Sequence, residues 1–260
     1  MNLTLGVRLI SASVRSALSL RATFFLRVLL MFANNFLFFI IWWILFQRVD
    51  QIAGWRLNDV AFLFGVSAAG FGLGCALLQG FIRLPQLIRD GGLDSYLLKP
   101  ASVLQQVLAS RSEPSAWGDV LSGLTMLLMS GYLNTVNLPA ILICIGCGAS
   151  TFVSSGVIFH SLAFWFDQAD DLASRLWETT ITFSLYPENI FPGGVRFLLY
   201  TLWPAGLIAF LPSRIVRTHS PELLLVLVPA SIAFALLAQF IFNRGLARYE
   251  SGNRFSLHGV

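Results

Sequence analysis

The sequence predicts an all-α integral membrane protein with six membrane-spanning helices. Three observations predict it: 56% of the 260 residues are hydrophobic, only 12% are charged, and the charged residues leave long apolar windows between them. A soluble domain carries about 25% charged residues, so this chain lacks the polar surface that water requires. The formal net charge of +4 comes from arginines that flank apolar blocks, a pattern that argues against a nucleic-acid-binding patch.

Windows without a charged residue locate most of the spans, because a bilayer core about 30 Å thick needs about 20 apolar residues in a helix. The windows that fit one span each are 28–47, 60–82 and 223–243, and the window 120–166 fits two spans joined near residues 134–139. Charge spacing alone therefore predicts the first four spans and the last one.

The region between the fourth and the last span is interrupted by prolines. We expect a fifth span at about residues 172–190, followed by a re-entrant helical hairpin over residues 191–220, which holds Pro204 and Pro212. Proline removes a backbone donor, so a broken helix at membrane depth persists only where protein buries it or where it lines a cavity. If both apolar runs of this region crossed the membrane, the chain would have seven spans.

The distribution of basic residues predicts that both termini lie in the cytoplasm. With six spans, the side that holds the termini receives twelve of the 17 basic residues, and cytoplasmic loops carry an excess of arginine and lysine. Residues 1–26 place Arg8, Arg15 and Arg21 among apolar residues at roughly helical spacing. We expect this segment to be an amphipathic helix on the membrane surface and not a cleaved signal peptide, and residues 244–260 to be a cytoplasmic tail.

Few side chains within the spans suggest chemistry. The sequence shows no phosphate-binding loop, nucleophile–base pair or metal-ligand spacing, so we expect no catalytic site, metal or cofactor in this chain. His160 is either a proton relay or a packed side chain. The G-x-x-x-G of Gly70 and Gly74 predicts close helix packing. Asn34 and Asn35 point to different sides of the first span, so at least one of them either bonds to another helix or lines a polar cavity.

The loop over residues 83–118 is the largest predicted feature between the spans. Gly91 and Gly92 follow a short apolar helix and allow the positive φ that ends it. Asp94 is expected to cap a new helical turn, which Pro100 stops. A linker that merely rests on lipid would need neither device. The pattern therefore favours a shaped cytoplasmic element with exposed leucines that docks on a soluble partner.

The stretch LIRDGGLDSYLLKPAS resembles the I-R-x-G-x-L-D-x-x-L-L-K-P signature of ABC-2-type transporter permeases, in a branch of permease components of about 260 residues. The matching residues are Ile88, Arg89, Gly91, Leu93, Asp94, Leu97, Leu98, Lys99 and Pro100. A second stretch, SLYPENIFPGGVRFLLYTLWPAGLIAFLP, resembles the same family through Tyr186, Pro187, Phe191, Arg196, Pro204 and Pro212. The resemblance covers the six-span plan, and thus most of a single permease domain over residues 1–260.

This resemblance implies a permease subunit of an ATP-binding-cassette exporter in the bacterial inner membrane. Two permease protomers, identical or often a related non-identical pair, would assemble with two soluble ATPase subunits that bind the ATP and Mg²⁺. The loop after the second span would be the coupling helix that docks on the ATPase, and the hairpin would cap the exit. The implied coupling residues are Leu84, Leu87, Ile88, Arg89, Gly91, Gly92, Leu93, Asp94, Tyr96, Leu97, Leu98, Lys99 and Pro100. The implied exit-hairpin residues are Tyr186, Pro187, Arg196, Pro204 and Pro212.

Alternating access would then carry the substrate outward between protomers, along a path rich in phenylalanine from spans one, two and five. The residues expected on this path are Asn34, Asn35, Phe64, Phe71 and Phe183. An apolar path with a few amides favours a hydrophobic or amphipathic substrate over a sugar. Two other functions stay open: a secondary transporter driven by an ion gradient, with His160 or Glu178 carrying protons, and a membrane assembly subunit that transports nothing.

Overall fold

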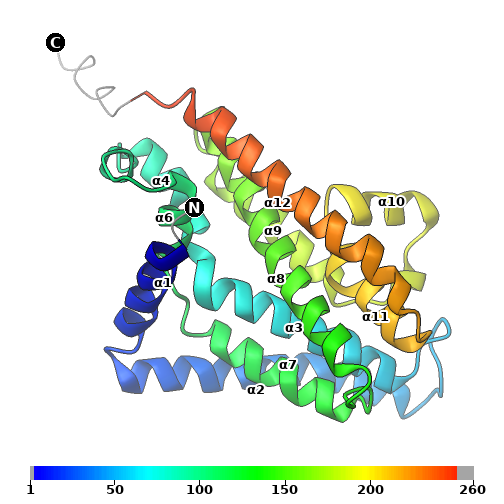
Figure 1. Ribbon diagram of the computed structural model, residues 1–260. Coiled ribbons are helices and arrows are strands. Elements are labelled where there is room, and N and C mark those ends of the chain that lie inside the picture. The colour runs from blue at the N-terminus through cyan, green and yellow to red at the C-terminus, as the bar shows by residue number, and fades with distance from the viewer. Residues whose placement is uncertain (1–2, 251–260) are drawn as a thin grey trace.

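The structure, a computed structural model, describes residues 3–250, with side chains from residue 6, and contains no β-strand in that range (Figure 1). The long helices are α2 (Arg21–Phe46), α3 (Leu57–Leu78), α8 (Leu138–His160) and α12 (Leu224–Leu246). Helices of intermediate length are α1 (Leu3–Ala17), α7 (Ala116–Met129), α9 (Asp170–Ser184), α10 (Gly193–Thr201) and α11 (Leu211–Arg217). The short segments are η1 (Gln79–Arg83), α4 (Leu84–Arg89), α5 (Asp94–Leu97), α6 (Val103–Ala109), η2 (Ser161–Phe164), η3 (Glu188–Ile190), η4 (Gly206–Phe210) and η5 (Pro221–Leu223).

Four helical segments are long and apolar enough to cross a membrane: Arg21–Phe46, Leu57–Arg89, Leu138–Phe164 and Pro221–Leu246. A fifth crossing exists if α10 and the segment Gly206–Arg217, bent by 88° relative to it, count as one span. The predicted all-helical membrane class is therefore confirmed, whereas the count of six spans stays a prediction. Spans three and five were expected at α7 and α9, whose 14 and 15 residues reach only about 21–23 Å.

Local turns explain why these two helices are short. α7 stops before Gly131, which takes a φ of +74°, and α9 begins after Gln168, which takes a φ of +62°. α9 ends at Ser184, before Pro187, so the span expected at 172–190 is shorter at its C-terminal end. A residue with positive φ reverses the chain and interrupts the helical hydrogen-bond ladder.

The N-terminal segment is divided, in contrast to the single helix expected over residues 1–26. α1 ends at Ala17 and α2 begins at Arg21, so that Arg21 and Arg27 belong to the first long helix. α1 lies across the end of α2 and packs against α6 and α3 (Figure 1). Its position on a membrane surface stays a prediction, and the expected tail over residues 244–260 falls partly outside the described residues.

α3 and α8 form the centre of the bundle, with α7 packed along α3 and α12 along α8 (Figure 1). Most of α3 and α8 is buried, whereas α2 and α12 expose large apolar side chains such as Leu29, Phe38 and Leu225. A helix surface of this kind is expected to face lipid. α2 and α12 are therefore the outer helices of the protomer.

Glycines bring the central helices into close contact. A Cβ atom added to Gly72 of α3 would lie 2.6 Å from the backbone nitrogen of Val120 in α7. On the other side of α3, a Cβ at Gly70 would lie 3.3 Å from the backbone nitrogen of Ala149 in α8. The close helix packing predicted from Gly70 and Gly74 is confirmed, since Gly74 also approaches α8.

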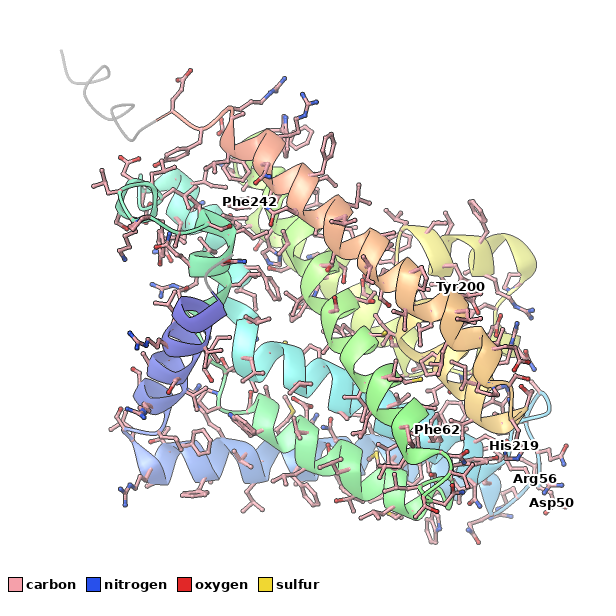
Figure 2. The ribbon with its side chains drawn as sticks, in the orientation of Figure 1. Asp50, Arg56, Phe62, Tyr200, His219 and Phe242 are labelled. Atoms are coloured by element: carbon pink, nitrogen blue, oxygen red, sulfur yellow. The ribbon has the colours of Figure 1, made fainter. Side chains whose placement is uncertain are left out.

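The two ends of the bundle carry different elements. We call the end that holds α1, α4, α5, α6 and the last turn of α12 the loop end, and the end that holds residues 47–56 and 130–137 with α10 and α11 the hairpin end (Figure 1). Buried phenylalanines fill the core between them, with Phe242 towards the loop end and Phe62 towards the hairpin end (Figure 2).

Candidate functional site

The loop end is shaped by one glycine turn and one glycine contact. α4 ends at Arg89, and Gly91 takes a φ of +70°, as the sequence predicted for the end of that helix. Gly92 has no positive φ; it is instead packed against the preceding helix, where a Cβ would lie 2.8 Å from Leu87 Cδ2. The chain then forms α5 as a single helical turn, so the predicted sequence of helix, turn and helix is confirmed.

The apolar residues of this loop divide into an inner and an outer set. Leu84 and Leu93 are completely buried in the protein's own core, where they cannot contact a partner. Leu97 is half exposed and Leu98 is 87% exposed. The outer set is therefore the tip of the loop, and the expectation of exposed leucines holds for two of them.

Asp94 does not cap α5, contrary to the sequence-based expectation. The residue preceding the helix is Leu93, and no side-chain bond caps this end. The Asp94 carboxylate instead accepts a hydrogen bond from the Tyr249 hydroxyl at 3.0 Å, which ties the loop to the end of α12. The pKa of the Tyr249 hydroxyl is raised to about 12, mainly by burial and secondly by this hydrogen bond. Asp94 is the first residue of α5 and lies one position beyond the N-cap, so its observed side-chain bond is this tertiary contact and not a cap.

Two further contacts hold the loop in place. The guanidinium of Arg89 donates from Nη1 to Asp170 Oδ2 at 2.7 Å, which links α4 to the start of α9. Gln106 of α6 is buried and donates from Nε2 to the carbonyls of Tyr96 and Ala101, at 3.1 and 3.0 Å. The loop is thus fastened to α6, α9 and the end of α12.

The hairpin expected over residues 191–220 consists of α10, a sharp bend that contains Pro204, and the continuous segment η4–α11. Glu188 is buried at its base and accepts bonds from Arg214 Nη2 at 3.2 Å and from the Tyr200 hydroxyl at 3.3 Å. Arg196 donates from Nε to the carbonyl of Phe191 at 3.0 Å. Buried Glu188 therefore links α10 and α11 of the hairpin, a role that the sequence analysis did not predict.

The remaining expected hairpin residues have separate roles. Tyr186 is exposed and lies edge-on to Trp42 of α2, with ring centroids 6.1 Å apart, and Pro187 is buried. Pro212 lies where η4 passes directly into α11, and because proline has no N–H, one helical hydrogen bond of this continuous segment is missing there.

A second buried carboxylate lies beside the hairpin. Asp59 of α3 forms an ion pair with Arg217, with 3.1 Å between Oδ1 and Nε, and it accepts hydrogen bonds from the Tyr132 hydroxyl at 2.6 Å and from the backbone N–H of Arg56 at 2.8 Å. The Arg217 guanidinium also stacks over the Trp55 ring at 4.2 Å. The pKa of the Tyr132 hydroxyl is raised to about 12, mainly by burial and secondly by the hydrogen bond to Asp59. This cluster joins α3, α11 and the loop before α8.

A cavity of about 520 Å³ lies between α2, α3, α7, α8 and α9, and it opens to the surface beside exposed side chains of α2 such as Phe38 and Ile41. Four of the five residues expected on a translocation path border it: Asn34, Asn35, Phe64 and Phe71. Phe183 does not border it, because its ring packs on the hairpin against Phe191 and Trp203 at 5.6 and 6.1 Å.

Asn35 connects this cavity to a buried acid. Its Nδ2 donates to Asp119 Oδ1 at 2.7 Å and to Ser122 Oγ at 2.8 Å, both on α7. Asn34 contacts only Met31 on its own helix, at 3.8 Å between Nδ2 and Sδ. The sequence left open whether these asparagines bond to another helix or line a cavity. Asn35 does both. Asp119 also borders it and was missed, because in the sequence it served only as the limit of an apolar window.

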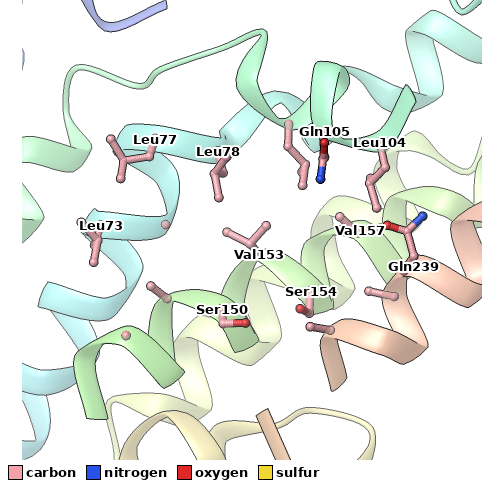
Figure 3. A pocket seen from close by; sticks show the side chains of 16 residues that line it. Leu73, Leu77, Leu78, Leu104, Gln105, Ser150, Val153, Ser154, Val157 and Gln239 are labelled. Atoms are coloured by element: carbon pink, nitrogen blue, oxygen red, sulfur yellow. The ribbon is translucent and has the colours of Figure 1, made fainter. Parts of the chain in front are cut away.

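A second cavity, of about 420 Å³, lies between α3, α6, α8 and α12 (Figure 3). Its polar lining residues are Gln105, Ser150, Ser154 and Gln239, and no charged side chain borders it. It therefore offers hydrogen bonds without a charge.

The residues considered for proton transfer lie away from both cavities. His160 is buried, with Nδ1 2.8 Å from the Gly156 carbonyl and its ring edge-on to Phe81. Glu178 is exposed on α9. Within residues 3–250, no group of three His, Cys, Asp or Glu side chains is arranged to hold a metal ion.

A helical bundle with several candidate spans defines a multi-span helical membrane protein. The family model of the ABC-2 family transporter proteins matches residues 29–253, and the chain therefore belongs to that family. This membership confirms the resemblance seen in the loop and hairpin sequences, and it fits a permease subunit of an ABC transporter, a membrane component that is not itself catalytic. Neither a curated protein nor a solved structure matches the chain.

Proposed function

We propose that this chain is the membrane subunit of an ATP-driven exporter and is moved by separate ATPase subunits that dock on its loop end. The observation that supports this most is the tip of the loop, where Leu97 and Leu98 are exposed on a scaffold held by Leu84, Leu93 and the contacts of Arg89. Apolar side chains on a fixed scaffold form the kind of surface that a protein partner covers. The remaining predicted coupling residues would set the shape of this surface.

In this proposal the chain lies in the bacterial inner membrane with six spans and both termini in the cytoplasm. Two permease protomers, identical or related, assemble with two ATPase subunits, which hold the ATP and Mg²⁺. Nucleotide binding closes the ATPase pair, the loop ends move together, and the bundles rock to release a hydrophobic or amphipathic substrate past the hairpin.

The exposed face of α9 supports contact between two protomers. Arg175, Glu178 and Thr182 are exposed at helical spacing on this face. Charged side chains at membrane depth rarely face lipid and instead face another helix or a water-filled path. We therefore place α9 towards the second protomer.

The test is co-purification with a phosphate-loop ATPase, to be sought among the reading frames next to the gene for this chain. We expect Leu98→Asp to reduce the amount of bound ATPase at least about tenfold, because a charge enters the centre of an apolar contact. Val136→Asp is the matched control, since Val136 is 84% exposed, close to the 87% of Leu98, but lies at the hairpin end. Undiminished ATPase binding by Leu98→Asp would contradict docking at this tip.

Transport measurements separate the proposal from the alternatives. Purified chain without the ATPase, reconstituted into vesicles under a proton or sodium gradient alone, is expected to move no solute. Transport under these conditions would favour a secondary transporter, whereas an ATPase that binds but whose hydrolysis drives no transport would favour an assembly subunit.

A further inference from the structure

We propose that the cavity bordered by Asn35 and Asp119 binds an amphipathic cation, with its amine head group at Asp119 and its apolar body among the aromatic rings. The inference rests on the proposed function as a permease and names the chemical class of the molecule that this cavity takes. At about 520 Å³ the cavity falls within the usual range for small-molecule sites, about 300–1,000 Å³.

The first argument is an incomplete set of hydrogen bonds on a buried acid. Asp119 is only 5% exposed, and its Oδ1 accepts from Asn35 at 2.7 Å. Its Oδ2 has no hydrogen-bond partner among the described residues. A buried carboxylate oxygen without a partner is costly, so a donor supplied by a ligand would be bound favourably.

The second argument is the charge balance of the lining. Asp119 is the single acid on the cavity wall, and no lysine or arginine borders the cavity. The two other buried acids, Asp59 and Glu188, each have an arginine partner. A cationic ligand would give Asp119 a positively charged partner, which Asp59 and Glu188 already have in an arginine of this chain.

The third argument is the composition of the remaining wall. Aromatic side chains from several helices border the cavity, among them Phe38 and Trp42 of α2 and Phe64 of α3. Aromatic faces attract ammonium groups and also cover alkyl chains. The second cavity, which lacks both an acid and such a set of rings, serves as an internal comparison (Figure 3).

The experiment is photo-crosslinking of the full chain in lipid nanodiscs. Three probes share one diazirine-bearing alkyl chain and differ in head group, which is a primary ammonium, an alcohol or a carboxylate. We expect the ammonium probe to label α2, α7 and α9 saturably and at least about tenfold more efficiently than the alcohol probe. Asp119→Asn is expected to remove this preference, and Asp119→Glu to retain most of it. Asp171→Asn, which removes an exposed acid at the start of α9, is expected to leave it unchanged.

Equal labelling by the ammonium and alcohol probes in the unmodified chain would overturn the proposal, and this comparison needs no variant to fold. A preference that persists in Asp119→Asn would overturn it as well, as would labelling confined to the peptides of the second cavity. The ATPase takes no part in this experiment. Its failure would therefore leave docking at Leu98 intact, and failure of the docking experiment would leave the cavity result intact.

Discussion

The hairpin end and the loop end of the bundle differ in how deeply their ion pairs are buried. At the hairpin end, Asp59 and Glu188 are buried and each meets an arginine of α11. At the loop end, the contact between Arg89 and Asp170 joins two half-exposed side chains. A buried charge is costly to uncover, whereas an exposed pair contributes little to stability. Glu113, between α6 and α7, is also largely buried and pairs with Arg111 at 2.9 Å and with Arg27 at 3.4 Å. The comparison teaches that both ends contain a largely buried ion pair, and that the loop end adds to it an exposed pair and a backbone turn at Gly91.

The largest effect on stability is expected from Arg217→Gln. It leaves Asp59 buried without its cation and removes the stacking on Trp55, so we expect the free energy of unfolding to fall by about 3 kcal/mol. Unfolding of the purified chain in detergent measures this. Arg48→Gln, which changes an exposed arginine at the same end, is the control and is expected to have little effect. A loss of stability no larger than that of the control would contradict the role of Asp59 as a fastening point.

Glu188→Gln is expected to have the next largest effect, about 2 kcal/mol, because a charge-assisted bond to Arg214 is lost while the bond from Tyr200 can remain. Hydrogen–deuterium exchange should show faster exchange in α10 and α11 and no change in α4 to α6. Uniform acceleration across the whole chain would mean that Glu188 does not hold the hairpin specifically.

Gly91→Ala tests the backbone turn of the loop end. The φ of +70° at this position disfavours a side chain, so we expect a cost of about 1 kcal/mol and weaker ATPase binding. Gly146→Ala is the control, because Gly146 is helical and an added Cβ there would meet nothing within 4 Å. If both substitutions behaved alike, the turn would not be what shapes the loop.

The smallest effect is expected from Arg89→Gln, a change in stability close to that of a neutral surface substitution, because both members of its ion pair are partly in solvent. A double-mutant cycle with Asp170→Asn measures the coupling free energy, which should fall further as salt is raised. A coupling comparable to that between Arg217 and Asp59 would remove the contrast between the two ends.

The sequence predicted the helices that are long and free of charge, because length and hydropathy alone define them. α2, α3, α8 and α12 all overlap the expected windows, although α2 begins before its window, at Arg21. The turn at Gly91 was also predictable, since a glycine at the end of a helix has few other uses. The ends of α7 at Met129 and of α9 at Ser184 were not predicted, because hydropathy does not show where a helix inside an apolar window stops.

The contacts that define the candidate sites depend on helix rotation and could not be read from the chain. Asn35 and Asp119 are 84 residues apart in the sequence. They come into contact only because α2 and α7 pack with these two residues on the faces that meet. The same holds for Asp94, which pairs with Tyr249 instead of capping its own helix. Residue type predicted that these side chains would need partners, and only the packing of the bundle identifies which.

α11 carries Arg214 and Arg217 within one helical turn, and the two arginines neutralise acids that belong to different parts of the chain. Withdrawing this single short helix would therefore strand both negative charges at once. A partial displacement of the hairpin would break both ion pairs and so cost nearly as much electrostatic free energy as a complete displacement. It would not, however, give the hairpin the conformational freedom of complete displacement. The hairpin would thus be expected to occupy two positions, seated or fully withdrawn, with no stable position between them.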